Sequence, residues 1–150
     1  SQPPTVRMIM AQAQFLAELT ADGTVESFIP HCRGVVSTAR TDDPNSGNAQ
    51  FFLMTGRAEH LDEAYTAKGR VLIGQDVVEA IKLGPEPNGF PILNPDSLLK
   101  ATLVSTLPAA EQRKVWVQKT DSEAWAAKLA AADQLGNHIC DLPPVPAVME

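Results

Sequence analysis

The sequence predicts a mainly β domain, on three observations. Short segments rich in β-branched or aromatic residues occur at residues 33–40, 49–56 and 69–74. Turn-forming residues separate these segments, as expected when strands are joined by loops. Apolar residues at helical spacing are clearest near the C-terminus, at residues 121–135. The expected architecture is therefore a β domain followed by a helical C-terminal region.

The N-terminal part begins with an ambiguous segment. Residues 6–19, VRMIMAQAQFLAEL, fit either a helix or a buried strand, so both alternatives stay open. The Asp-Gly pair in residues 20–24 indicates a turn. Residues 33–40 predict a strand because Val35 and Val36 are β-branched.

The central part alternates between strands and loops. Residues 41–48 predict a loop rich in turn formers. Residues 49–56 are almost wholly apolar, which predicts a strand covered on both faces. Residues 57–68 predict a loop with one helical turn, and residues 69–74 predict a third strand.

A short helix is expected after the third strand, at residues 75–84. Asp76 is expected to cap its start and Gly84 to end it. The prolines of residues 85–97 predict an irregular crossing, and residues 97–107 then predict a further strand, with a helix as the alternative.

The C-terminal region contains the longest predicted helix, at residues 121–135, capped by Asp121 or Ser122. A short strand is expected before it, around residues 115–117, and an extended tail after it, at residues 140–150. The apolar face of the helix comprises Trp125, Leu129, Ala132 and Leu135.

Composition limits the classes of function. The chain has 150 residues, 44% of them hydrophobic and 20% charged, which is enough for one domain with a real core. A formal charge of −6 argues against binding to nucleic acid or to an anionic membrane surface. No run of apolar residues reaches the length of a bilayer-spanning helix, so no membrane insertion is expected.

Motif chemistry offers little support for an acid–base or metal enzyme. The three histidines, His31, His60 and His138, belong to no recognisable metal-binding pattern. The sequence contains no nucleophile motif and no phosphate-binding glycine loop. We therefore expect no metal and no cofactor.

The two cysteines, Cys32 and Cys140, leave two alternatives open. They are either free buried thiols or a disulfide that ties the C-terminal tail to the body of the domain. A disulfide would imply an oxidising compartment, periplasmic or secretory, whereas free thiols are compatible with the cytoplasm.

A distinctive constellation lies between residues 37 and 69. The stretch DPNSGNAQFF, residues 43–52, places the amide of Gln50 next to two phenylalanines. Strand alternation puts Gln50 and Phe52 on one face, where an amide and an aromatic ring could bind a peptide. In the alternative, Phe52 belongs to the core and Gln50 bonds to a local loop.

This constellation resembles a known family. Residues 34–84, from GVVSTARTDDPNSGNAQFF to GQDVVEAIKLG, are similar to the C-terminal half of a cyclophilin-type peptidyl-prolyl cis-trans isomerase. Residues 94–104 resemble the closing strand of that family, and residues 108–150 resemble the extension of some proteobacterial members. The resemblance implies an antiparallel β-barrel with capping helices, complete or incomplete, in residues 1–107. It implies a C-terminal extension packed on that barrel in residues 108–150.

The resemblance also assigns roles to individual residues. Gln50 would bond to the peptide backbone near the isomerising bond, and Phe52 and Leu61 would line a proline pocket. These two roles would make Gln50 and Phe52 the catalytic residues recognisable here. Further contacts to the substrate would come from Ala39, Arg40, Thr41, His60 and Tyr65.

The implied function is isomerisation of X–Pro bonds in peptides and proteins, which assists protein folding. Rotation about such a bond breaks amide resonance, at a barrier of about 18–20 kcal/mol. A site that fixes the proline ring and bonds to the twisted amide lowers this barrier without a nucleophile. The implied partners are proline-containing segments and cyclosporin-like ligands.

The N-terminal half of the family pattern is not recognisable. The family places a catalytic arginine there, and the nearest candidate, Arg7, stands too close to Gln12 to fit the pattern. One alternative is therefore a non-catalytic binding or structural module. Another is a barrel that a second chain completes.

Overall fold

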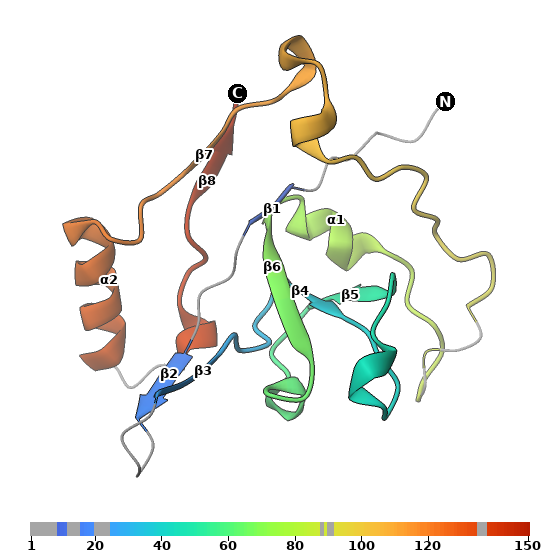
Figure 1. The fold of residues 1–150 in the computed structure, drawn as a ribbon, viewed down its shortest axis with the longest axis horizontal. Helices are drawn as coiled ribbons and strands as arrows, with labels where there is room; N and C mark the ends of the chain where they lie inside the picture. The colour runs from blue at the N-terminus through green and yellow to red at the C-terminus, as the bar shows by residue number, and fades with distance from the viewer. Residues whose placement is uncertain (1–8, 12–15, 20–24, 88, 90–91, 135–137) are drawn as a thin grey trace.

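The computed structural model describes residues 9–11, 16–19, 25–87, 89, 92–134 and 138–150 (Figure 1). The predicted turn at residues 20–24, together with Arg7, Gln12 and Leu135, lies outside these described residues.

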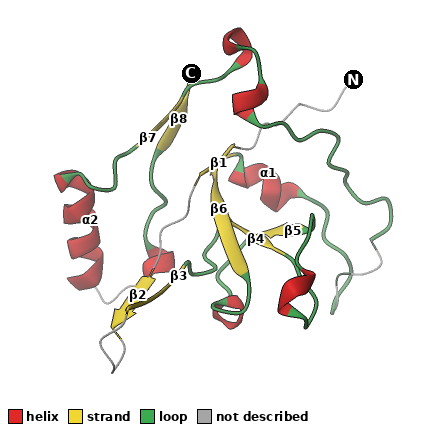
Figure 2. Ribbon diagram, viewed as in Figure 1, coloured by secondary structure: helices red, strands yellow, loops and turns green. Residues whose placement is uncertain are grey.

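The centre of the fold is a four-stranded antiparallel sheet in the order β1-β6-β4-β5 (Figure 2). Its inner strands are β4 (Val35–Thr38) and β6 (Thr66–Ile73), and its outer strands are β1 (Ile9–Ala11) and β5 (Phe51–Leu53). The strands predicted at residues 33–40, 49–56 and 69–74 are confirmed, although β6 begins three residues earlier, at Thr66.

Side-chain alternation along β4 divides the core between the two faces of the sheet. On one face Val36 packs with Val71, Val78 and Leu53 beneath α1 (Gln75–Ala80). On the other face Val35 and Met54 form a second cluster. The partly buried side chains of this second cluster are Ile29, Cys32, Phe52, Ala58, Leu61 and Ala67.

The predicted cap and end of the first helix are wrong. Gly74 caps α1 in the left-handed conformation, at φ +93°, and its carbonyl accepts from the N–H groups of Val77 and Val78. Glycine tolerates this conformation, and it turns the chain sharply from β6 into the helix. Asp76 lies within the first turn instead, and the helix ends at Ala80, before Gly84.

The apolar strand at residues 49–56 is not covered on both faces as predicted. β5 lies at the edge of the sheet, and the Phe51 side chain is 49% exposed. An edge strand has one strand neighbour instead of two, so less of its surface is covered.

Two further pairs of strands lie outside the central sheet. β2 (Leu16–Leu19) pairs with β3 (Val25–Phe28), so residues 6–19 hold strands in their described part rather than a helix. β7 (Val115–Val117), which confirms the predicted strand, pairs with β8 (Ala147–Met149). The C-terminal tail is therefore extended, as expected, but it ends in a paired strand.

The C-terminal helix α2 (Glu123–Gln134) matches the prediction closely. Ser122 caps it, because its Oγ accepts from the N–H of Trp125. Trp125 is buried with 2% of its surface exposed, whereas Leu129 on the same predicted face is exposed. Among the described residues of this face, Trp125 is the one large side chain that is buried.

The strand predicted at residues 97–107 does not form. The described residues from 81 to 103 belong to no helix or strand and run as an open trace outside the sheet (Figure 1). A strand needs a neighbour for its backbone hydrogen bonds, and this segment has none among the described residues. The described strands accordingly form three separate sheets and no closed barrel.

Short 3-10 turns complete the described fold, and no described helix is long and apolar enough to cross a membrane. The helical turn predicted within residues 57–68 is confirmed as the turn η2. The turns are η1 (Pro44–Ser46), η2 (Glu59–Leu61), η3 (Val104–Thr106), η4 (Ala109–Glu111) and η5 (Ile139–Asp141).

Candidate functional site

Three rings form an aromatic cluster on the Val35–Met54 side of the sheet: His31, Phe52 and Tyr65. The Phe52 ring stacks on His31 with centroids 6.0 Å apart, and it meets Tyr65 edge to face at 5.7 Å. Phe52 also packs against the cluster of Val35 and Met54 and remains partly exposed. These contacts fix the orientation of Phe52 while part of its surface stays available.

His31 is the buried support of this cluster, with 1% of its surface exposed. Its Nδ1 lies 2.8 Å from Oδ1 of Asp62, and its backbone N–H donates to the same oxygen at 2.7 Å. Its Nε2 lies 3.0 Å from Oγ of Ser37. Since the carboxylate accepts from Nδ1–H, neutral His31 is left with Nε2 as an acceptor for the Ser37 hydroxyl. Every polar atom of the imidazole is therefore paired.

Sequence reasoning missed this role of His31. The histidine and its carboxylate partner stand 31 residues apart, and no local motif joins them. The Asp62 that follows Leu61 in the HLD stretch was a usable signal, because a carboxylate beside a predicted pocket residue needs a partner if it is buried.

The turn η2 brings the predicted pocket residue Leu61 to the aromatic cluster. Leu61 packs on the Val35–Met54 cluster, and its carbonyl accepts from the N–H of Tyr65 at 3.1 Å. The adjacent His60 is exposed. The turn thus joins Leu61 and Tyr65 by one hydrogen bond and directs His60 toward solvent.

Arg40 ties the segment after β4 to the same cluster. Its Nε and Nη2 donate to the carbonyl of Ala64, at 2.9 and 2.7 Å, and its Nη1 donates to the carbonyl of Thr41 at 2.8 Å. The guanidinium lies 5.0 Å from the centroid of the Tyr65 ring, in cation–π geometry. Arg40 and Thr41 are therefore held beside Tyr65 at the surface.

Gln50 is positioned by its backbone. Its carbonyl accepts from the N–H of Ala39 at 2.9 Å, and its N–H donates to Oδ1 of Asn48 at 3.2 Å. Within the described residues its side-chain amide makes no hydrogen bond, and the residue is exposed. Gln50 is thus fixed in place with its amide facing solvent.

The loop before Gln50 is ordered by its own polar side chains. Asp43 caps η1 by accepting from the N–H of Asn45 at 2.9 Å. The Oγ of Ser46 accepts from both the N–H and the hydroxyl of Thr41, at 2.9 and 2.8 Å. These bonds explain why the stretch before Gln50 is rich in short polar residues.

The predicted site residues that contact the aromatic cluster or the core beneath it are Phe52, Leu61, Tyr65 and Arg40. Gln50 and Ala39 are joined to each other by a backbone hydrogen bond, and His60 is exposed. Arg7 lies outside the described residues, so its position relative to Gln50 stays a prediction. A disulfide joins Cys32, next to His31, with Cys140 of the C-terminal tail. In the described part of the chain, no three His, Cys, Asp or Glu residues are arranged to hold a metal ion.

Comparisons with known proteins identify the family of the chain. The sequence model of the family described as cyclophilin type peptidyl-prolyl cis-trans isomerase/CLD matches residues 9–103. The chain therefore belongs to this family, and the predicted cyclophilin-like, mainly β fold is confirmed. The match starts at β1, well before residue 34, where the recognisable motifs of the family begin.

Individual relatives place the chain within the family. A probable peptidyl-prolyl cis-trans isomerase of Brucella abortus is 41% identical over 86 residues, which cover 57% of this chain and 42% of that protein. The isomerase CYP23 of Arabidopsis thaliana is 37% identical over 59 residues, which cover 39% of this chain and 26% of that protein.

A solved structure matches over most of the chain. Cyclophilin AquaCyp293 from Hirschia baltica superimposes with a TM-score of 0.73 at 39% sequence identity, covering 87% of this chain and 47% of that one. The chain thus spans less than half the length of these relatives.

Proposed function

We propose that this chain carries the substrate-binding side of a peptidyl-prolyl cis-trans isomerase that acts on X–Pro bonds in peptides and proteins. The observation that carries the proposal is Phe52, which is held between His31 and Tyr65 while the residue remains partly exposed. A rigid, partly exposed aromatic residue next to Leu61 is a suitable apolar seat for a proline side chain.

The proposed mechanism needs no nucleophile. Phe52 and Leu61 fix the proline ring, and the free amide of Gln50 bonds to the peptide backbone beside the X–Pro bond. Bonds that strengthen as the amide twists lower the barrier to rotation. The remaining contacts, to the residues flanking the proline, fall to Ala39, Arg40, Thr41, His60 and Tyr65.

A second polypeptide segment is part of the proposal. The family resemblance assigns a catalytic arginine to the half of the barrel that is not recognisable here, and the chain spans less than half of its relatives. The edge strand β5 and the exposed leucines after α1 offer surface for such a segment. We propose that full activity requires a polypeptide that completes the barrel, and that the chain alone binds proline peptides.

The family resemblance also divides the chain into two parts. Residues 1–107 would form the cyclophilin-like domain, and residues 108–150 would form an extension packed on it. Support comes from the Cys32–Cys140 disulfide and from the hydrogen bond of Arg70 Nη2 to the carbonyl of Val145, at 3.0 Å. The disulfide also supports an oxidising compartment, periplasmic or secretory.

The isomerase proposal is tested by measuring cis–trans exchange of an X–Pro peptide by NMR, with and without the chain, alone and together with an added N-terminal barrel segment. We expect Phe52→Ala to lower the exchange rate about tenfold or more, because the proline ring loses its apolar contact. Phe51→Ala is the matched control: it removes the neighbouring ring, which projects from the other face of β5, and should leave the rate unchanged. Gln50→Ala should lower the rate without weakening the fold.

Peptide binding, followed by chemical shifts, separates the outcomes. Exchange that stays at the background rate even with the added barrel segment, with peptide binding that Phe52→Ala abolishes, would favour the non-catalytic module. Acceleration that appears only with the added segment would favour the two-part enzyme. Peptide binding unchanged in both Phe52→Ala and Gln50→Ala would overturn the site itself. A cyclosporin-like ligand should compete with the peptide if it takes the same surface.

A further inference from the structure

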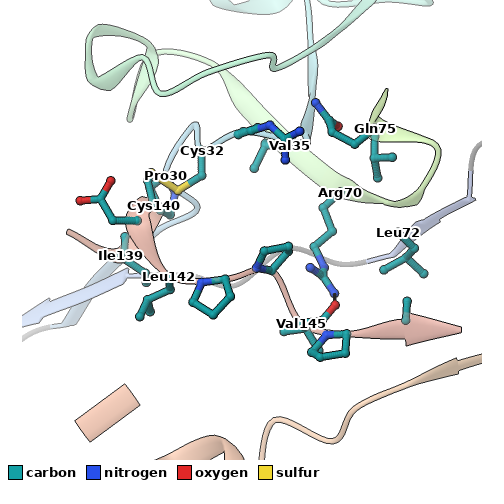
Figure 3. A pocket seen from close by; sticks show the side chains of 18 residues that line it. Pro30, Cys32, Val35, Arg70, Leu72, Gln75, Ile139, Cys140, Leu142 and Val145 are labelled. Atoms are coloured by element: carbon teal, nitrogen blue, oxygen red, sulfur yellow. Dashed lines mark hydrogen bonds between the residues drawn. A yellow bond between two sulfur atoms is a disulfide. The ribbon is translucent and has the colours of Figure 1, made fainter. Parts of the chain in front are cut away.

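A cavity of about 470 Å³ lies between the C-terminal tail and the central sheet (Figure 3). One wall is the tail, with Pro143, Pro144 and Pro146, and the other wall is formed by Val71 and Leu72 of β6 and by residues around the start of β4. The Cys32–Cys140 disulfide closes one end. The size and the apolar walls are typical of small-ligand sites.

Two of the three charged residues that line the cavity are neutralised by partners. Arg33 pairs with Glu79, with Nε and Oε1 2.6 Å apart. Asp141 accepts from the N–H of His138 at 3.2 Å and lies 3.9 Å from Arg57. Neither residue therefore has an uncompensated charge to offer a ligand.

Arg70 is the third charged residue, and it has no ionic partner among the described residues. It projects from β6 toward the tail, and its Nη2 donates to the carbonyl of Val145 (Figure 3). Its other N–H groups make no hydrogen bond within the described part of the chain. Burial lowers the pKa of Arg70, but a guanidinium stays protonated in proteins. Within the described residues, the cavity therefore contains a half-buried cation with unused donors.

The wall of the cavity also contains an unpaired acceptor. The Oε1 of Gln75 is buried, and no donor reaches it among the described residues, whereas its Nε2 donates to the carbonyl of Met54. Because this oxygen has almost no exposed surface, a ligand in the cavity does not reach it, and the polar contact of the cavity falls to Arg70.

We propose that this cavity binds a carboxylate attached to an apolar body, of the kind that the C-terminal residue of a peptide presents. The carboxylate takes the free N–H groups of Arg70, and the apolar body packs between the tail prolines and β6. A polyphosphate does not suit the cavity, because the described residues of the cavity provide one unpaired cation, Arg70, and largely apolar walls. The residues of the aromatic cluster do not line the cavity, so this site is separate from the one proposed for proline.

The test uses the full chain with N-acetyl-L-leucine and, as a neutral control, N-acetyl-L-leucinamide. Binding is followed by the methyl shifts of Val71, Leu72 and Val145 in carbon–proton NMR spectra. We expect saturable shifts with the acid, about tenfold weaker binding of the amide, and weaker binding of the acid as salt rises.

Arg70→Met keeps the aliphatic stem and removes the charge, so it should weaken the acid to the level of the amide. Arg113→Met, which removes an exposed arginine outside the cavity, should leave binding unchanged. Equal binding of acid and amide to the unaltered chain would overturn the proposal even if Arg70→Met fails to fold. Shifts that map to residues outside the cavity would overturn it as well, whatever the outcome of the isomerase assay.

Discussion

Two apolar regions of this chain differ in how far their side chains are buried. The valines of the central sheet and α1, Val35, Val36, Val71 and Val78, are 5–7% exposed. The leucines of the segment after α1 are as hydrophobic or more so, yet they are 68–88% exposed. These leucines are Leu83, Leu93, Leu98, Leu99 and Leu103.

The difference shows that an apolar side chain becomes buried only where a neighbouring surface can cover it. Three of these valines lie on the paired strands β4 and β6, and Val78 covers one face of the sheet from α1. The leucines belong to a segment with no strand neighbour among the described residues. These exposed leucines all belong to one segment, which makes that segment a candidate for contact with a partner.

The largest expected effect tests this contrast with two truncations. Met54→Ala should lower the free energy of unfolding by about 2–5 kcal/mol, because it opens a cavity in a buried cluster. Leu99→Ala should change it by no more than about 0.5 kcal/mol, because the side chain is exposed. Urea denaturation of the two variants and the parent chain measures both values.

The same pair sharpens the proposal of a completing segment. If an added barrel segment buries the leucines, Leu99→Ala should become destabilising in the mixture and remain neutral in the chain alone. A large cost of Leu99→Ala in the chain alone would mean that the leucines are already covered, and the contrast would not hold.

A smaller effect is expected at the buried histidine. His31→Ala leaves Asp62 and Ser37 without their partner and should cost about 1–3 kcal/mol of unfolding free energy. The exposed His60 is the matched control, and His60→Ala should leave stability unchanged. Thermal denaturation followed by circular dichroism would compare them. Equal stability of the two variants would contradict the supporting role of His31.

The smallest expected effect concerns the exposed ion pair that joins α1 to the loop before β4. The hydrogen bond from Arg33 lowers the pKa of the Glu79 carboxyl, and Gln75 contributes in the same direction. Because the pKa is depressed in the folded chain, this contribution to stability is present above the ordinary carboxyl pKa. It is lost as the pH falls through the depressed value.

Arg33→Met should therefore raise the pKa of Glu79 toward its ordinary value, as read from a carboxyl NMR titration. Its effect on stability should be confined to neutral and mildly acidic pH and should vanish in strong acid. A Glu79 titration that does not respond to Arg33→Met would show that the pair does not persist in solution.

The local sequence pattern was sufficient to predict several strands and the C-terminal helix. β4, β6 and β7 fall where β-branched residues predict strands, and α2 falls where Ser122 and the spacing around Trp125 predict a helix. The pattern failed where the pairing or burial of a segment depends on residues far away in the sequence. Residues 97–107 read as a strand but have no neighbour, and β5 reads as a covered strand but lies at an edge.

The site divides in the same way. The motifs of residues 34–84, which include Gln50 and Phe52, make the family recognisable, and the family model matches residues 9–103. Their roles in binding remain predictions. The support behind Phe52 could not be read from the sequence, because His31 meets Asp62 across a separation of 31 residues.

By itself, then, the sequence determined the family, the strands β4, β5 and β6 of the central sheet, and the residues proposed to meet a proline. Propensity, alternation and motif order are local properties that the chain carries wherever it lies. Only the tertiary structure decided that His31 supports Phe52, that Arg70 projects into a cavity beneath the tail, and that the leucines after α1 stay exposed. Each of these depends on which distant surface reaches the residue, and folding alone fixes that.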